Sequence, residues 1–277
     1  MKHSEWKKII KGKILSNLQI APNHFELKIA APWLAKEFRA GQFVMVKSRN
    51  ETTDPLLRIP LAIHSRNGKN INLLYKTVGS GTEILSCRKK GEIIDLIGPL
   101  GNGFNYDSAL KIKGMKVLIV AGGHGIVPLY LLAKVLREHK VEVEVFIGAG
   151  TEKYILCEEK LKKIGTKVHI ATEDGTKGAK GYVLDPLMAY LKKENVKKFS
   201  SSAPRDVSHL VYACGPKSML AALGRELKKY NVAAEFSLEA YMVCGIGACL
   251  GCAVMTTSGY KMVCKDGPVF DMRSIVF

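Results

Sequence analysis

The chain has 277 residues, with 42 lysines and arginines against 25 aspartates and glutamates, which gives a net charge of +17. This length suggests about two domains with ordinary cores, and the 47% apolar and 24% charged residues exclude a disordered chain. The lysines are spread along the chain without interleaved aromatic residues. We therefore interpret the charge as solvated helix faces, or as a field that steers an acidic partner or an anionic dinucleotide, rather than as a nucleic-acid site.

Two classes of segment are not predicted. No stretch approaches the roughly 20 apolar residues that span a bilayer, and the first residues, MKHSEWKKII, lack the apolar run of a secretory signal. We expect a cytoplasmic protein.

The first part of the chain reads as short strands separated by Gly, Pro and Asn. The apolar or alternating runs are residues 25–30, 42–48, 70–78 and 91–98. Such runs are typical of a small antiparallel β-barrel. We assign this barrel to residues 1–108.

From about residue 110 the pattern changes to strands that alternate with helices. The predicted strands are residues 115–121, 141–150, 167–174 and 209–216, and Leu129, Leu132, Ala133 and Leu136 follow the first of them at helical spacing. Alternation of this kind predicts an α/β domain with a parallel sheet and crossover helices. We assign it to residues 109–233 and expect the sheet to end near Ala233, where a cysteine-rich module, residues 234–277, begins.

Two loops of the predicted sheet are candidates for ligand binding, because ligands bind beyond the carboxyl ends of parallel strands. In the first, Gly122, Gly123 and Gly125 separate a strand from its helix, where a pyrophosphate could approach the backbone. The motif is shorter than GxGxxG, so an ordinary turn remains an alternative. The second loop is Cys214, Gly215 and Pro216, in which a lone cysteine is by default a small buried apolar residue.

The cysteines are unevenly distributed, since four of the seven fall in the last 34 residues. Cys244, Cys249, Cys252 and Cys264 follow the C-x4-C-x2-C pattern with a more distant fourth cysteine, which is the spacing of plant-type [2Fe-2S] proteins. Glycines between them permit backbone N–H groups to turn toward an anionic cluster. Structural zinc is less favoured, because Cys264 has no nearby Cys or His partner in the sequence, and four buried structural cysteines are a further alternative.

Taken in order, several motifs resemble one family. They are AGQFVMV (40–46), LLRIPLAI (56–63), LLYKTVGSGT (73–82), GPLGNGF (98–104), AGGHGIVPL (121–129), ACGPKSML (213–220), CGIGACLGC (244–252) and VCKDGPVF (263–270). The sequence resembles the ferredoxin reductase superfamily, and within it the iron–sulfur electron-transfer subunits of dihydroorotate dehydrogenase B. The resemblance covers nearly the whole chain. It implies a ferredoxin-reductase-like fold with FAD on the barrel, NAD(H) on the α/β domain and one [2Fe-2S] cluster in the C-terminal module.

The resemblance also implies roles for individual residues. The residues implied near the flavin ring are Pro60, Leu61, Ala62 and Ile63. Those implied around the rest of the FAD are Leu74, Tyr75, Lys76, Gly81 and Thr82, the last two near its pyrophosphate. Cys214 is implied to lie near the nicotinamide, and Cys244, Cys249, Cys252 and Cys264 are the implied cluster ligands.

One departure from the family concerns the flavin-binding strand, which usually reads Arg-Pro-x-Ser. This chain has Ile59-Pro60-Leu61-Ala62, and its arginine, Arg58, comes one residue early. Because side chains alternate between the two faces of a strand, a shift by one residue points Arg58 away from the site unless a bulge intervenes.

The leading hypothesis is an NAD(P)H-dependent flavin and iron–sulfur oxidoreductase subunit. It exchanges electrons with an FMN-containing dihydroorotate dehydrogenase catalytic subunit in pyrimidine biosynthesis. The alternatives are a reductase subunit of another redox complex, such as a hydrogenase or a ferredoxin-dependent NADPH system, and a non-catalytic iron–sulfur redox sensor. Acidic residues after two predicted strands, Glu152, Glu173 and Asp174, favour NADH over NADPH.

Overall fold

The computed structural model describes residues 7–49, 54–196, 209–230 and 232–277. Its contacts divide the chain into two compact units. Unit 1 comprises residues up to Gly103 together with Ala240–Val254 and Tyr260–Pro268, and unit 2 comprises Phe104–Glu239, Met255–Gly259 and Val269–Phe277. The three-part division at residues 108 and 233 stays a prediction.

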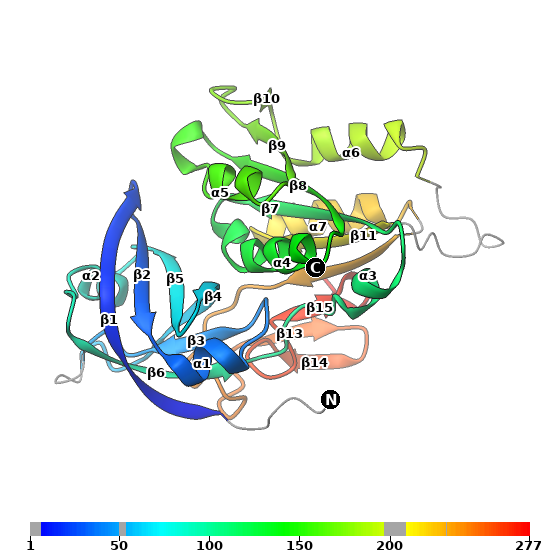
Figure 1. Ribbon diagram of the computed structural model, residues 1–277. Coiled ribbons are helices and arrows are strands. Elements are labelled where there is room, and N and C mark those ends of the chain that lie inside the picture. The colour runs from blue at the N-terminus through cyan, green and yellow to red at the C-terminus, as the bar shows by residue number, and fades with distance from the viewer. Residues whose placement is uncertain (1–6, 50–53, 197–208, 231) are drawn as a thin grey trace. The chain divides into compact units, whose positions relative to one another are not determined.

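Unit 1 is built on a closed antiparallel barrel with strand order β1-β2-β5-β4-β3-β6 (Figure 1). The strands are β1 (Lys8–Ala21), β2 (His24–Ala30), β3 (Phe43–Val46), β4 (Ile59–Asn67), β5 (Asn70–Lys76) and β6 (Ile93–Leu100). Two short helices, α1 (Pro32–Glu37) and α2 (Ser80–Ser86), connect them. The barrel interior is filled by apolar residues from alternate positions, among them Leu27, Ile29, Ile71 and Leu73, none of which has exposed surface.

The predicted barrel is confirmed, but the sequence reading missed its longest strand. β1 has 14 residues and pairs with both β2 and β6. Its lysines at positions 8, 11 and 13 interrupt the apolar pattern that signals a strand. The place of β1 in the barrel is therefore decided in part by its pairing with β6, which lies far along the chain.

Unit 2 contains a seven-stranded sheet with strand order β10-β9-β8-β7-β11-β12-β15. The strands are β7 (Lys116–Gly122), β8 (Glu142–Ala149), β9 (Lys167–Thr172), β10 (Ala179–Lys180), β11 (His209–Cys214), β12 (Ala233–Ser237) and β15 (Val269–Asp271). The strands from β10 to β12 are parallel, as the alternating pattern predicts, and β15 is antiparallel at one edge. Core strands such as β7 and β11 are buried along almost their whole length.

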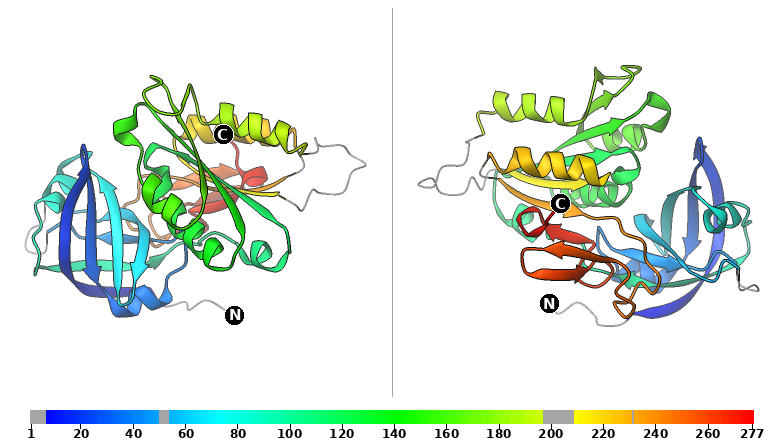
Figure 2. Two further views of the ribbon diagram at one scale, coloured as in Figure 1. Left: turned by 45° about the horizontal axis from the view of Figure 1, so that its top comes forward. Right: turned by 180° about the vertical axis from the view of Figure 1, so that it is seen from behind.

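Helices cover both faces of this sheet (Figures 1 and 2). They are α3 (Asp107–Lys111), α4 (Ile126–Glu138), α5 (Glu158–Lys163), α6 (Leu184–Lys193) and α7 (Lys217–Leu227), with three short 3-10 helices, η1 (Gly123–Gly125), η2 (Glu152–Tyr154) and η3 (Met272–Ser274). α4 packs on β7 and β8 through the apolar stripe that the spacing of Leu129, Leu132 and Leu136 predicts. No helix in the described residues is long and apolar enough to cross a membrane.

The end of the sheet differs from the prediction. We expected the sheet to stop near Ala233, but β12 begins there and continues to Ser237, and β15 adds a strand from the C-terminal segment. The same segment forms a hairpin of β13 (Ala253–Thr256) and β14 (Gly259–Met262). A three-residue strand such as β15 gives no periodic signal, so only its pairing with β12 reveals it.

Candidate cofactor sites

Two loops meet at the carboxyl edge of the sheet in unit 2. A β-carbon at Gly125 would lie 2.1 Å from the carbonyl oxygen of Cys214, and one at Gly122 would lie 2.7 Å from Pro216 Cδ. Glycine is therefore required at both positions, because no other residue allows the start of α4 to approach the end of β11 so closely. Gly123 has a φ of +51° and open space around it. The structure thus brings together both loops that the sequence predicts for a nucleotide, and the backbone at Gly123 has open space for a pyrophosphate.

Cys214 ends β11 and is 2% exposed. Burial raises the pKa of its thiol well above the usual range, and the nearby Glu239 carboxylate raises it further. The thiol therefore stays protonated at neutral pH, which suits a packing or positioning role and not that of a nucleophile. Glu239 is not predicted from the sequence, because its nearness to Cys214 follows from the pairing of Cys214 with Ser237 of β12, which only the structure shows.

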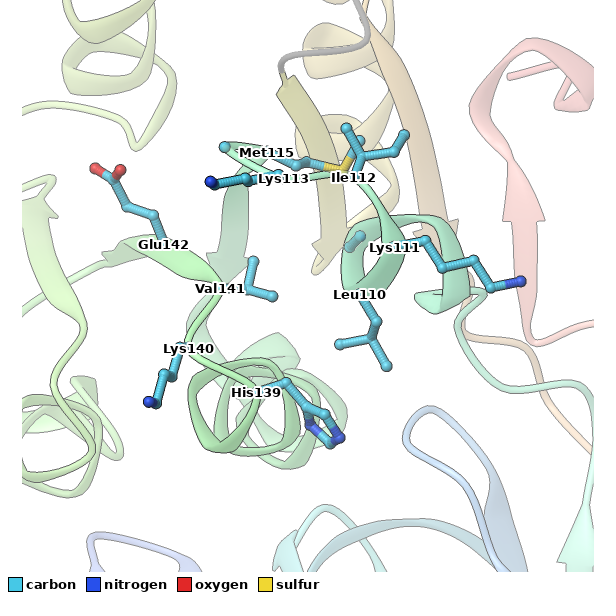
Figure 3. Close-up of a pocket in the computed structure, with 11 residues that line it drawn as sticks. Leu110, Lys111, Ile112, Lys113, Met115, His139, Lys140, Val141 and Glu142 are labelled. Atoms are coloured by element: carbon cyan, nitrogen blue, oxygen red, sulfur yellow. The ribbon is translucent and has the colours of Figure 1, made fainter.

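The cavity shown in Figure 3 lies elsewhere in unit 2. It has a volume of about 440 Å³ and is formed by the connections that precede β7 and β8, so it lies at the amino ends of these strands. Its lining includes Lys111, Lys113, His139 and Lys140. It is therefore distinct from the carboxyl edge, where Gly122 and Cys214 lie.

The strand predicted to bind the flavin is β4 of unit 1, which pairs regularly with β3 from Ile59 to Ala62 without a bulge. The arginine that precedes it points elsewhere: Arg58 Nη1 lies 2.9 Å from Asp95 Oδ1 of β6. Ile59, by contrast, lies against the start of α2, since a β-carbon at Gly81 would be 3.1 Å from Ile59 Cδ1. At the position where the family has its phosphate-binding arginine, this chain thus has an apolar side chain beside Gly81. The part of Arg58 in binding FAD stays a prediction.

The other residues predicted for FAD lie on β4, β5 and α2. Pro60 and Ala62 are half-buried, whereas Leu61, Ile63 and Leu74 are buried and Lys76 is exposed. Tyr75 is fully buried and donates its hydroxyl to Asn17 Oδ1 at 3.0 Å, and burial raises its pKa to about 12. Its side chain therefore belongs to the core of unit 1.

Thr82 closes the turn that begins α2. Its Oγ1 accepts the N–H groups of Val78 and Gly79 at 2.9 and 3.2 Å and donates to the carbonyl of Gly79. The hydroxyl is thus occupied by the turn, which holds Gly79, Ser80 and Gly81 in place. The backbone at Gly79 has open space beside it, whereas Ile59 lies against Gly81, so β4 offers this turn an apolar side chain in place of a cation.

The four C-terminal cysteines all belong to unit 1, and their thiols meet in two pairs. Cys244 interacts with Cys249, and Cys264 with Cys252, whose sulfur also accepts the N–H of Cys264 at 3.4 Å. Within the described residues, no three His, Cys, Asp or Glu side chains are placed to hold a metal ion together. Two pairs of thiols suit a two-iron cluster, in which each iron takes two protein ligands.

Backbone N–H groups turn toward the sulfurs, as the glycines of this loop predict. The N–H groups of Ile246 and Ala248 donate to Cys244 Sγ at 3.5 and 3.3 Å. Burial opposes ionisation of Cys244, but the backbone donors outweigh it and lower the pKa of this thiol to about 6. Gly245 and Gly247 make the loop possible with φ angles of +70° and +84°. The chemistry of this donor set therefore fits an anionic iron–sulfur cluster.

The two cysteine pairs differ in exposure. Cys252 and Cys264 are 3% and 1% exposed, whereas Cys244 is half-buried and Cys249 is exposed. Ile246 and Leu250 in the same loop are 43% and 60% exposed. One side of the proposed cluster thus faces an apolar surface.

Comparison with known proteins identifies the family. Residues 239–276 match the model of the iron–sulfur cluster binding domain of dihydroorotate dehydrogenase B, and residues 119–224 match the oxidoreductase NAD-binding domain. The dihydroorotate dehydrogenase B (NAD(+)) electron transfer subunit of Desulforamulus reducens is 37% identical over 98% of this chain and 99% of its own length. The chain belongs to the family of dihydroorotate dehydrogenase B electron transfer subunits.

Further relatives agree with this assignment. The electron transfer subunit of a Geobacillus species is 38% identical over 95% of this chain and 96% of its own. A solved structure described as NADH-dependent reduced ferredoxin-NADP oxidoreductase, from work on flavin-based electron bifurcation, is 30% identical with a TM-score of 0.79. The match covers 96% of this chain and 89% of the chain in that structure. The ferredoxin-reductase-like fold that the motifs predict is confirmed.

Proposed function

We propose that this protein is the electron-transfer subunit of a dihydroorotate dehydrogenase B. It passes electrons between NAD(H), FAD and a [2Fe-2S] cluster, to or from an FMN-containing catalytic subunit in pyrimidine biosynthesis. The observation that supports this most is the 37% identity to a relative of that name over 98% of the chain. The iron–sulfur domain match spans all four clustered cysteines.

Three cofactors divide the chemistry. NADH is a two-electron hydride donor, whereas an iron–sulfur cluster exchanges one electron at a time, and a bound flavin would supply the chemistry that links the two. In unit 2, Gly123 leaves open space for the pyrophosphate of NAD(H), Gly122 and Gly125 let the start of α4 approach the end of β11, and Cys214 stays a neutral thiol beside the glycine loop. In unit 1, Cys244, Cys249, Cys252 and Cys264 would hold the cluster, and β4 would lie beside the flavin ring.

The proposal also covers the cellular location of the protein and its partner subunit. We place it in the cytoplasm, in a hetero-oligomer with its catalytic subunit, because the named relatives are subunits of a larger enzyme.

The test is co-purification of the full chain with its native partners, followed by spectroscopy and turnover. We expect a flavin spectrum, a [2Fe-2S] electron paramagnetic resonance signal and orotate reduction by NADH that requires both subunits. A preparation with neither flavin nor NADH-dependent dye reduction would instead indicate the redox sensor.

A second candidate is a reductase subunit of a ferredoxin-dependent NADPH system. It is favoured by the 30% identity to the ferredoxin-NADP oxidoreductase structure and by Ile59 and Ala62, which depart from the flavin motif. Co-purification with a ferredoxin-linked partner, and no orotate-dependent turnover, would select this candidate.

A further inference from the structure

The loops that follow β8 and β9 are joined to each other at the carboxyl edge of unit 2. The N–H groups of Glu173 and Asp174 donate to the carbonyls of Ala149 and Gly150 at 3.0 and 3.2 Å. Thr176 Oγ1 accepts the N–H of Glu152 at 3.0 Å. The two loops therefore form one surface next to β7, the strand that leads into the glycine loop.

This surface is where the adenosine ribose of a bound dinucleotide is expected. In doubly wound sheets the pyrophosphate lies at the glycine turn, and the ribose 2′ position lies near the end of the neighbouring strand. Whether that position carries a hydroxyl or a phosphate distinguishes NADH from NADPH. A 2′-phosphate needs lysine or arginine donors, since it adds a charge of nearly two units.

Two lysines next to this surface are already paired with one carboxylate. Glu158, the first residue of α5, accepts from Lys162 Nζ at 2.7 Å through Oε1 and from Lys177 Nζ at 2.5 Å through Oε2. The Glu158 side chain is 11% exposed, whereas those of Lys162 and Lys177 are 50% and 40% exposed. A shielded carboxylate thus holds two accessible lysines, one from α5 and one from the loop after β9.

The remaining charges on this surface are mostly negative. Glu152, Glu173 and Asp174 are exposed, and Asp174 Oδ1 is fixed by the hydroxyl and the N–H of Thr176 at 2.6 and 3.0 Å. Lys153 and Lys180 are also exposed, so the surface keeps two lysines against three carboxylates. A phosphate here would meet repulsion unless further lysines became free.

We propose that Glu158 is a specificity-determining residue that selects NADH over NADPH by holding Lys162 and Lys177 in ion pairs, so that neither lysine is free for a 2′-phosphate. This inference rests on the proposed binding of NAD(H) to unit 2. Glu158 acts through the lysines and makes no contact with the nucleotide.

The test compares nucleotides in the full holoprotein, with an artificial electron acceptor. Replacement of Glu158 by glutamine (E158Q) frees both lysines, and we expect the ratio of kcat/KM for NADPH to that for NADH to rise about tenfold, the effect of one gained charge-assisted contact. Adding Lys177→Met to E158Q should remove most of that gain. A merely structural role of Glu158 would lower both kcat/KM values and leave the ratio unchanged.

Glu159→Gln is the matched control. Glu159 Oε1 lies 3.3 Å from Lys162 Nζ, but its side chain is 74% exposed, against 11% for Glu158. We expect this variant to keep the wild-type ratio.

Two results would overturn the inference. One is a folded E158Q variant with an unchanged nucleotide ratio. The other comes from Lys177→Met in the wild-type background, which does not depend on the folding of E158Q. This variant should leave the nucleotide ratio unchanged. A selective loss of NADPH turnover would show that Lys177 already binds the phosphate in the wild type. Failure of the wild type to oxidise either nucleotide would reject the proposed function, whereas a wild type that prefers NADPH would reject only this inference.

Discussion

At the scale of single residues, the cysteine motif and the predicted flavin motif are equally short, but the structure places their residues differently. Cys244, Cys249, Cys252 and Cys264 lie in unit 1 as two thiol pairs that suit a two-iron cluster. Arg58, one residue out of place in its motif, pairs with Asp95. The cysteines of one motif thus lie close together, whereas the arginine beside the other motif is held by a different strand, and the roles of both as cofactor ligands stay predictions.

The first prediction concerns the exposed cysteine pair. Replacement of Cys249 by serine should abolish the [2Fe-2S] paramagnetic resonance signal, because cluster ligation needs thiolates. NADH-to-dye activity through the flavin should partly survive. Cys87, also exposed and located at the end of α2 in unit 1, provides the control, since its serine variant should keep the signal. An unchanged signal in the Cys249 variant would refute its assignment as a ligand.

The second prediction concerns the missing arginine. Ile59→Arg places a cation beside Gly81, where the pyrophosphate of FAD is expected. A hydrogen bond to a charged group contributes about 1.5–3 kcal/mol, so FAD affinity should rise about tenfold or more, measured by fluorescence titration of the deflavinated protein. Ile20→Arg adds the same charge at a 45% exposed position on β1 and should have no effect. Equal affinity in the wild type and the Ile59 variant would mean that the phosphate lies elsewhere.

At the scale of elements, the edge of the sheet in unit 2 depends on one carboxyl pair. Glu235 on β12 lies opposite Asp271 on β15 and accepts the N–H of Asn105 at 2.9 Å. Burial raises the pKa of Glu235 to about 7, and Asp271 adds to the shift, whereas the hydrogen bond from Asn105 opposes it. Protonated Glu235 is thus the form that this strand pair favours.

The third prediction is the pH dependence that follows. Because the folded pKa lies above the ordinary value of 4.5, the folded state binds more protons than the unfolded state between these values. The free energy of unfolding should therefore fall as pH rises from about 4.5 to 7. In the wild type, the free energy of unfolding should fall by about 1–2 kcal/mol between pH 5.5 and 8, and Glu235→Gln should abolish this fall. Urea unfolding measures it over the pH range in which the cluster absorbance is constant. Glu226→Gln, a surface carboxylate on α7, should retain the wild-type slope.

At the scale of the whole molecule, an electron-transfer subunit must bring its cluster close to its partner's cofactor. The loop of Gly245 to Gly251 exposes Ile246 and Leu250 beside the thiols, and exposed apolar patches are a liability unless a partner covers them. We therefore expect this loop to form part of the interface. Most of the following residues 263–270, which the sequence also predicts for the interface, are buried, and only Lys265 among them is exposed.

The fourth prediction tests this interface. Leu250→Glu should weaken binding of the catalytic subunit about tenfold or more, because truncating or charging an interface anchor costs 1–2 kcal/mol or more, while FAD, cluster and melting temperature stay unchanged. Leu18→Glu on β1 is the matched control, since Leu18 is 61% exposed and Leu250 60%. Intact cofactors with undiminished partner affinity would mean that electrons leave by another surface.

The sequence alone predicts the two architectures and the cysteine motif, and its resemblance to known sequences indicates the family. Alternation of apolar residues in runs such as 25–30, the helical spacing from Leu129 to Leu136, and cysteines three to five residues apart are all local patterns. They depend on geometry within one strand, helix or loop, so they can be read without partners.

Only the tertiary structure decided where isolated polar residues and short strands belong. The ion pair of Arg58 with Asp95 spans 37 residues, and β12 pairs with β15 from the C-terminal segment. Lys177 reaches Glu158 across 19 residues. Such contacts depend on which strands become neighbours, which is set by burial and pairing over the whole unit and leaves no periodic mark in the sequence.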